Sequence, residues 1–391
     1  MEKKYVENIC CEVEKESVKE YHAMAPEIVQ TSSFHFPTAE DFIACSDDEK
    51  NNYVYTRGTN PTTEILEKKL ARLEGGEKCK VFSSGMGAIA ATMFTLLEQG
   101  DHVIMVNTIY GEALALIKYM EKFGIERTKI DVSSTDEIAL EIKKNTKMIY
   151  FESPSSQKFE LLDLEKIAAM AKKQQIFTVI DSTWASPLFQ HPLSYGIDLV
   201  IHSCSKYIGG HSDIVAGAVI GSERLVDNIF ENGHQSLGAT NSPFNSWLAI
   251  RGLRTLAVRM NHQHQAIIQV LDHLLKDHRI AKIFHPYCGT VEQKDLADKY
   301  LSGYGSLFAI DLVDEDFGKL KNFLNALEVV TIGVSWGGFE SLALPAFKGN
   351  NLAAIEKRGL SPAHVRLYVG LEEPMSIVED IQQALDTAYG K

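Results

Sequence analysis

The chain has 391 residues, 45% of them hydrophobic and 23% charged, which is typical of a soluble globular protein with a large core and two domains. Its net charge of −13 and pI near 5.5 argue against a nucleic-acid or membrane partner, because either would need a basic face. No apolar stretch approaches the ~20 residues of a transmembrane helix. Six cysteines occur without a Cys-x-x-Cys pair, so we expect no disulfide scaffold, no metal site and a cytoplasmic location.

The N-terminal part of the chain divides into an arm and a helix. Polar runs over residues 1–60 predict an irregular arm. From Pro61 a stripe of apolar residues predicts a helix that Thr62 or Thr63 caps and that Gly75 and Gly76 end.

Apolar strand-like runs then alternate with helical patterns. This alternation predicts an α/β fold with a mainly parallel sheet covered by helices on both faces. The expected strands are residues 80–82, 103–106, 148–151, 177–180 and 199–202, followed by a run over 216–220. Active sites of such sheets lie at the carboxyl ends of the strands.

A long helical stretch from about Pro243 to Lys276 leads into a second unit. That unit has strand-like runs at residues 306–312, 329–334 and 365–369 and an amphipathic helix near 376–388. We therefore expect an N-terminal arm over 1–60, a cofactor-binding α/β domain over 61–250 and a smaller C-terminal α+β domain over 251–391.

Lys206 and Asp181 each follow an apolar run, and together they indicate the chemistry. A lysine amine can form a Schiff base with pyridoxal 5'-phosphate, and an aspartate can keep the pyridine nitrogen protonated so that the ring accepts electrons. A lysine after a strand is more often a surface charge, so this interpretation depends on the neighbouring motifs.

A glycine-containing turn follows the first expected strand and opens a helix, with Gly85 and Met86 at its start. The free N–H groups of such a helix end can hold a phosphate. The spacing Gly85-x-Gly87-x-x-Ala90 also resembles a dinucleotide fingerprint, but the strand at 102–106 is not followed by the acidic residue that this fingerprint requires. A turn that only allows close helix packing remains a third interpretation.

Two further pairs of residues can reach a phosphate. Ser203 and Ser205 would point to one face if their segment were extended, although solvated hydroxyls at a strand end are an alternative. Tyr55 and Arg57 form a phenolic and cationic pair that can clamp a phosphate, although an exposed loop arginine is the commoner explanation.

Six further motifs occur in a fixed order along the chain. They are Tyr55-Thr56-Arg57-x-x-Asn60-Pro61-Thr62, Ser84-Gly85-Met86, Asp181-x-Thr183, Ser203-x-Ser205-Lys206-Tyr207, Arg251-Gly252-Leu253-Arg254-Thr255-Leu256 and Arg366-Leu367-x-Val369-Gly370-Leu371-Glu372. Together they resemble the Cys/Met-metabolism family of fold-type I pyridoxal phosphate enzymes. That family includes methionine γ-lyases, cystathionine β- and γ-lyases and enzymes that replace a γ-substituent.

The resemblance implies a role for each cofactor-site residue. Lys206 would carry the cofactor and move protons, Asp181 would pair with the ring nitrogen, and Tyr110 would stack on the ring. The phosphate would be held by Gly85, Met86, Ser203 and Ser205 of one subunit and by Tyr55 and Arg57 of its neighbour. The resemblance thus implies a homo-oligomer, in this family a tetramer, with sites shared across a dimer.

The resemblance also implies how a substrate would bind and react. Arg366, helped by Ser335, would bind the α-carboxylate, as would Ser156, which stands where many members have an asparagine. The implied reaction is β- or γ-elimination on cystathionine, methionine, cysteine or homocysteine, which yields a thiol, ammonia and a 2-oxo acid. Replacement at the γ-carbon is the alternative, and a scaffold that binds the cofactor without catalysis is a third possibility.

Several positions depart from the commonest family pattern. Tyr368 stands for a serine, and Glu112 follows Tyr110-Gly111 where methionine γ-lyases have a cysteine. Val334 is apolar where cystathionine γ-lyases carry a glutamate, which suits an apolar sulfur substituent. We expect Glu112 to face solvent, and the preferred substrate is left open.

Overall fold

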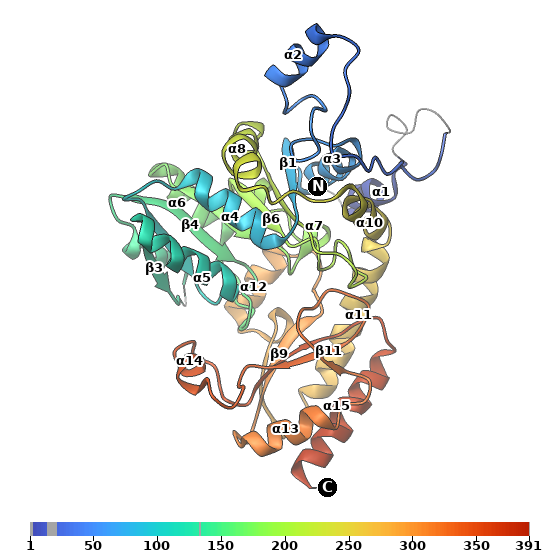
Figure 1. Cartoon of the computed structure of the whole chain (residues 1–391). Helices are drawn as coiled ribbons and strands as arrows, with labels where there is room; N and C mark the ends of the chain where they lie inside the picture. The colour runs from blue at the N-terminus through green and yellow to red at the C-terminus, as the bar shows by residue number, and fades with distance from the viewer. Residues whose placement is uncertain (1–2, 14–21, 133, 391) are drawn as a thin grey trace.

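The computed structural model describes residues 3–13, 22–132 and 134–390. Within these residues, seven strands form a large sheet and five form a smaller one (Figure 1). The large sheet is built from the first part of the chain, and the small sheet from residues beyond Arg279. No helix in the described ranges is both long and apolar enough to cross a membrane.

The large sheet has the strand order β1-β7-β6-β5-β4-β2-β3. Only β7 runs antiparallel to its neighbours, so the predicted, mainly parallel sheet is confirmed. The strand β3 was not predicted, because its sequence is mostly polar and it lies at the sheet edge. The strands are β1 Lys78–Phe82, β2 His102–Val106, β3 Glu126–Ile130, β4 Thr146–Glu152, β5 Phe177–Asp181, β6 Leu199–His202 and β7 Gly217–Gly221.

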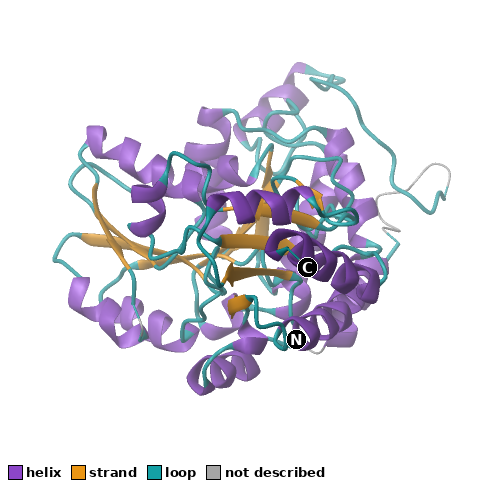
Figure 2. Ribbon diagram, turned by 90° about the horizontal axis from the view of Figure 1, so that it is seen from below, coloured by secondary structure: helices purple, strands orange, loops and turns teal. Residues whose placement is uncertain are grey.

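Helices cover both faces of this sheet, as Figure 2 shows. Successive residues of β2 explain why, since Val103 and Met105 pack into one apolar cluster and Ile104 and Val106 into another. A strand buried on both faces is the form expected between two helical layers. The helices of this part are α4 Gly85–Leu96, α5 Gly111–Met120, α6 Leu164–Lys173, α7 Ser186–Phe189, α8 Glu223–Ile229 and α9 Gln235–Leu237.

The arm is less irregular than predicted. It contains the helices α1 Lys3–Cys11 and α2 Ala39–Asp47, and α2 projects from the top of the body in Figure 1. The helix α3 Pro61–Glu74 is present, but its cap is Asn60, whose side chain accepts a hydrogen bond from the Thr62 N–H at 3.0 Å. The prediction of a Thr62 or Thr63 cap was wrong, because proline takes the first helical position and leaves the cap to the residue before it.

The long helical stretch is two helices, α10 Pro243–Leu253 and α11 Leu256–Leu274. The predicted helical stretch is present but interrupted, because the chain turns at Arg254 and Thr255, where the Thr255 N–H bonds the Gly252 carbonyl at 3.1 Å. A Cβ at Gly252 would lie 2.3 Å from the Gly209 carbonyl oxygen, so α10 packs directly on the loop that follows Lys206.

The small sheet has the order β10-β11-β12-β9-β8. The strands β9, β12 and a short β10 match the predicted runs, whereas β8 and β11 were not predicted. Its strands are β8 Ile280–Phe284, β9 Leu307–Leu312, β10 Thr331–Ile332, β11 Leu342–Pro345 and β12 His364–Tyr368. The helices are α12 Val291–Tyr300, α13 Phe317–Asn325, α14 Leu352–Glu356 and α15 Pro374–Tyr389.

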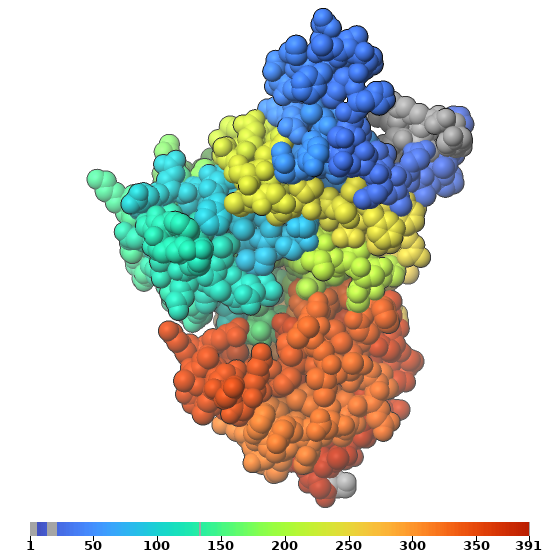
Figure 3. Space-filling view, in the orientation of Figure 1, coloured from blue at the N-terminus to red at the C-terminus, as the bar shows by residue number. Residues whose placement is uncertain are grey.

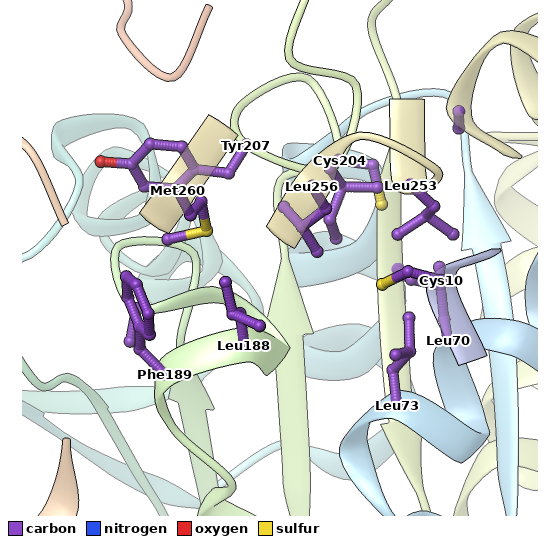
Figure 4. Close-up of a cluster of buried hydrophobic side chains, with 14 of the residues drawn as sticks. Cys10, Leu70, Leu73, Leu188, Phe189, Cys204, Tyr207, Leu253, Leu256 and Met260 are labelled. Carbon is purple, nitrogen blue, oxygen red and sulfur yellow. The ribbon is translucent and has the colours of Figure 1, made fainter. Parts of the chain in front are cut away.

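A continuous apolar core supports the region around Lys206. Tyr207 and Cys204, its near neighbours in sequence, are 1% and 0% exposed and pack with residues of α1, α3, α7, α10 and α11 (Figure 4). Cys204 is therefore a buried core thiol. Because the residues on both sides of Lys206 are fixed in the core, the backbone at Lys206 is held in place.

Candidate active site

The candidate site lies at the carboxyl ends of β4, β5 and β6. Glu152 ends β4, Asp181 ends β5, and Lys206 follows β6 after a turn. Strand β12 and a segment that we call the strap, residues 333–341, lie across from them. In Figure 3 the surface is hollowed between the teal region around α5 and the orange-red region around α14.

Lys206 is the half-buried amine of the site. Burial lowers its pKa, the neighbouring Arg366 lowers it further, and Asp181 acts in the opposite direction. The Nζ atom lies 5.8 Å from the centre of the Trp336 ring in the strap. A Cβ at Gly337 would come within 2.8 Å of the Lys206 Cα, so the strap backbone touches the lysine. An amine with a lowered pKa is a better nucleophile near neutral pH.

Asp181 is held rigidly by the threonine two residues later. Its Oδ1 accepts hydrogen bonds from the Thr183 N–H at 3.0 Å and from the Thr183 hydroxyl at 2.5 Å. The Thr183 Oγ1 accepts in turn from the Ser203 N–H at 2.8 Å, which links the ends of β5 and β6. Burial raises the pKa of Asp181, so a cationic partner is needed to hold its charged form.

The predicted phosphate loop forms the start of α4. Ser84 caps the helix by accepting from the Gly87 N–H at 2.9 Å, and helix geometry leaves the N–H groups of Gly85 and Met86 without an intrahelical acceptor. A Cβ at Gly85 would lie 3.2 Å from the Ser203 hydroxyl, so loop and hydroxyl adjoin.

Ser203 and Ser205 do not belong to an extended segment. The chain turns after β6, with the Lys206 N–H bonded to the Ser203 carbonyl at 3.1 Å, so the argument from alternating side chains was wrong here. The Ser205 hydroxyl donates to the Ala216 carbonyl at 3.2 Å and accepts from the Ala216 N–H at 3.0 Å. Ser203 therefore adjoins the phosphate loop, and Ser205 fixes the turn to the start of β7.

Tyr110 and Ser156 are joined by a residue for which the sequence suggested no role. Glu152 is 6% exposed, and its Oε1 accepts from the Tyr110 N–H at 2.5 Å while its Oε2 accepts from the Ser156 hydroxyl. The Tyr110 side chain is 48% exposed at the start of α5. A carboxylate at a strand end is usually solvated, so only the parallel pairing of Glu152 beside Asp181 could have indicated this burial.

Arg366 extends from β12 on the opposite side of the site. Its guanidinium has no hydrogen bond or ion pair to any residue in the described part of the chain. Burial lowers the pKa of this guanidinium to about 10, and the negative charge of Glu152 acts in the opposite direction. Such a guanidinium is suited to a bidentate bond with a carboxylate that enters from outside.

Ser335 lies in the strap, where its backbone has a φ of 78°. The residue is exposed, as is its neighbour Val334 at 76%. Tyr368 of β12 links the strap to α11, since its hydroxyl donates to the Gly338 carbonyl at 2.8 Å and accepts from Gln263 at 2.5 Å. Tyr368, which stands where the family commonly has a serine, therefore helps to hold the strap in place.

Within the described residues, no hydrogen bond joins Tyr55 or Arg57 to the phosphate loop of their own chain, although the Arg57 carbonyl accepts from the hydroxyl of Thr240, which pairs with Phe82 at the end of β1. Both Tyr55 and Arg57 are exposed, the Arg57 guanidinium lies 5.3 Å from the centre of the Tyr55 ring, and the Arg57 Nε donates to Gln235 at 3.2 Å. Glu112 is exposed at the start of α5, as expected.

The residues that are present fit pyridoxal 5'-phosphate. A Cβ on Gly217 would lie 2.2 Å from the Ser84 carbonyl oxygen, so only glycine lets β7 pass behind the phosphate loop. The free N–H groups of α4, the amine of Lys206 and the buried carboxyl of Asp181 supply a phosphate site, an aldehyde-binding group and a pyridinium partner. This arrangement defines a pyridoxal phosphate enzyme of fold-type I.

The comparisons identify the family. Residues 7–386 match the model of the "Cys/Met metabolism PLP-dependent enzyme" family, and the chain belongs to it. An L-methionine gamma-lyase from Pseudomonas deceptionensis is 39% identical over 93% of this chain and 92% of its own. A cystathionine beta-lyase from Lactococcus lactis subsp. cremoris is 35% identical over 86% of this chain and 90% of its own.

A solved structure extends the likeness to the fold. The cystathionine gamma synthase from Xanthomonas oryzae pv. oryzae, crystallised in complex with cystathionine, superposes with a TM-score of 0.92 at 29% identity and covers 98% of both chains. The predicted family, fold class and cofactor are thereby confirmed.

Proposed function

We propose that this protein is a pyridoxal-phosphate-dependent carbon–sulfur lyase that releases a thiol, ammonia and a 2-oxo acid from a sulfur amino acid. The observation that carries the proposal is the placement of Lys206 between a buried carboxyl at Asp181 and a guanidinium at Arg366 that has no partner within the described residues. Relatives named as methionine and cystathionine lyases, 35–39% identical, support this choice of substrate class.

The residues of the chain would act in a defined order. Arg366, with Ser335 and Ser156, binds and orients the α-carboxylate of the substrate. Lys206 removes the α-proton and returns it to another carbon, and for a γ-leaving group it also removes a β-proton. The cofactor, when bound, supplies an electron sink for the pair that α-proton removal leaves behind. Tyr110 would cover the cofactor ring, and Asp181 would stabilise the positive charge on its nitrogen.

The phosphate of the cofactor would be held from two chains. Gly85, Met86, Ser203 and Ser205 would hold it from the chain that carries Lys206. Tyr55 and Arg57 would reach it from a neighbouring subunit, and their exposure supports this. We accordingly infer a homotetramer with sites shared across each dimer. The domain division at residues 60 and 250 and a cytoplasmic location also stay predictions.

A γ-replacement enzyme is the second candidate. It is favoured by the 0.92 TM-score to the cystathionine gamma synthase. The two candidates share the same residues, because elimination and replacement differ only in whether a second thiol is captured.

Product analysis separates the two candidates. Purified protein is incubated with L-methionine, L-cystathionine, L-cysteine or L-homocysteine, and in parallel with O-acetylhomoserine plus a thiol. A lyase releases thiol and 2-oxo acid in equal amounts in the first set. Turnover confined to the second set, with a new thioether as product, would overturn the lyase proposal in favour of replacement.

A further inference from the structure

Glu152 is a buried carboxyl that none of the proposed roles uses. It ends β4 directly beside Asp181, the last residue of β5, and only 6% of it is exposed. Burying a carboxyl group without hydrogen-bonding partners costs free energy of folding. The partners of Glu152 therefore indicate its role.

Both oxygens of Glu152 are engaged, and each bonds a different loop of the site. Oε1 accepts from the backbone N–H of Tyr110 at 2.5 Å, and Oε2 accepts from the Ser156 hydroxyl. Tyr110 is the cap residue of α5, but its own side chain caps nothing. Glu152 of β4 therefore accepts the N–H at the N-terminus of α5 in place of a capping side chain, and the helix dipole favours a negative group there.

A second set of bonds joins the same two loops. The Ser156 N–H donates to the Thr108 carbonyl at 2.8 Å, and the Thr108 hydroxyl donates to Ser155 at 3.1 Å. The turn that carries Tyr110 and the turn that carries Ser156 thus form one body with Glu152 at its centre.

We propose that Glu152 is a positioning residue that fixes the Tyr110 ring and the Ser156 hydroxyl relative to each other, so that the cofactor side and the substrate side of the pocket are placed together. The inference rests on the proposed roles of Tyr110 and Ser156. It deepens the proposed function by adding a residue that touches neither cofactor nor substrate.

The charged and titratable groups around Glu152 make this unit sensitive to pH. Asp181 faces it from β5, Arg366 from β12, Tyr110 from the start of α5, and Arg358 from the end of α14. Burial raises the pKa of Glu152 to about 8, Asp181 adds to the rise, and Arg366 opposes it. The carboxyl loses its proton as pH rises through this range, and the resulting carboxylate binds the Tyr110 N–H more strongly.

The test compares Glu152→Ala and Glu152→Gln with the wild type. The readouts are the cofactor dissociation constant on reconstitution, the circular dichroism of the bound cofactor, and kcat and KM. We expect Glu152→Ala to weaken cofactor binding and raise KM by about 10- to 100-fold, because the loss of a positioning contact misplaces the reacting groups. Glu152→Gln keeps an acceptor for Tyr110, so it should restore both values to within a few-fold and should lose any titration step near pH 8.

Glu67 provides a matched control. It too is a largely buried glutamate whose pKa burial raises, and outside the site its Oε1 accepts the Val81 N–H at 3.0 Å and pairs with Lys80 at 3.1 Å. Glu67→Ala should lower Tm without changing the cofactor signal. If Glu152→Ala behaves like Glu67→Ala, with normal cofactor binding, dichroism and KM, the positioning role is overturned.

A shorter acid keeps the proposal testable if Glu152→Ala does not fold. Glu152→Asp retains the charge but withdraws it by one methylene, so we expect the same direction of change in cofactor binding, and no change would also overturn the proposal. Absence of turnover in the wild type would instead contradict the proposed function. The cofactor binding and dichroism of the variants would still test Glu152.

Discussion

The two sides of the site differ in how firmly their side chains are held. On the large-sheet side, Asp181 is bonded to Thr183, and Thr183 is bonded to the turn before Lys206. On the small-sheet side, Arg366 has no hydrogen-bonding partner in the described ranges, and Val334 of the strap is 76% exposed. We infer that the fixed side determines the class of chemistry and that the less constrained side determines which substrate is accepted.

The largest effect is expected on the fixed side, from Lys206→Ala. This variant should lose the visible absorbance of bound cofactor and at least about 10³-fold in kcat, because both the covalent anchor and the proton carrier are removed. Spectra and single-turnover rates measure both losses. A variant that retained the band and the rate would show that another residue is the anchor.

Arg366→Lys tests the substrate side. A lysine keeps the charge but cannot form the two parallel bonds of a guanidinium, so KM should rise by roughly 10- to 100-fold while the cofactor spectrum stays normal. Steady-state kinetics on the best substrate measure this. An unchanged KM would remove Arg366 from the substrate site, and a lost cofactor band would mean that the two sides are not separable.

Tyr368→Phe loosens the strap without touching the cofactor. It removes the bonds of the Tyr368 hydroxyl to the Gly338 carbonyl and the Gln263 amide, which keep only 3.5 Å contacts, and this should cost about 1–3 kcal/mol of stability and raise KM by a few-fold. Tyr300→Phe is the control, because Tyr300 is also buried and bonds Asp163 at 2.5 Å outside the site. Equal changes in Tm with a KM change only in Tyr368→Phe would support the account, and a normal KM in both would contradict it.

The dependence of stability on pH involves both sides. Burial lowers the pKa of His234, on the large-sheet side, to about 3 and that of His285, on the small-sheet side, to about 4. The unfolded chain therefore binds more protons than the folded one as pH falls below the ordinary value of 6.5, so stability is lost on acidification.

Each histidine should contribute roughly 2 kcal/mol of this loss between pH 6.5 and 5. His285→Gln should flatten the dependence of Tm on pH by less than half, because burial also lowers the pKa of His234, His102 and His191, which still titrate. An unchanged slope would show that His285 does not contribute to the acid sensitivity.

Local sequence patterns predicted the large sheet and the phosphate loop because both follow from apolar runs and glycines that act locally. They missed β3, whose polar residues suit an edge strand but resemble a loop. They also missed the break at Arg254 and Thr255 in the long helical stretch and assigned an extended segment at Ser203 and Ser205.

The site was less predictable where its geometry depends on tertiary contacts. Glu152 becomes a buried partner of Tyr110 only because β4 pairs with β5 and the start of α5 covers it. The sequence marked Tyr368 as a departure from the commonest family pattern. Its hydrogen bond to the strap could not be predicted, because the acceptor, the Gly338 carbonyl, lies thirty residues earlier in the chain. The roles of the candidate residues came from the family resemblance and stay predictions.

The most direct test of the central claim is the visible spectrum of the purified protein during addition of L-methionine, L-cystathionine and L-cysteine in turn, with thiol and 2-oxo acid assayed alongside. The account predicts a band of bound cofactor that at least one of these substrates perturbs, with release of thiol and 2-oxo acid in equal amounts. No band after pyridoxal 5'-phosphate is added, or a perturbed band without release of either product from any of them, would contradict it.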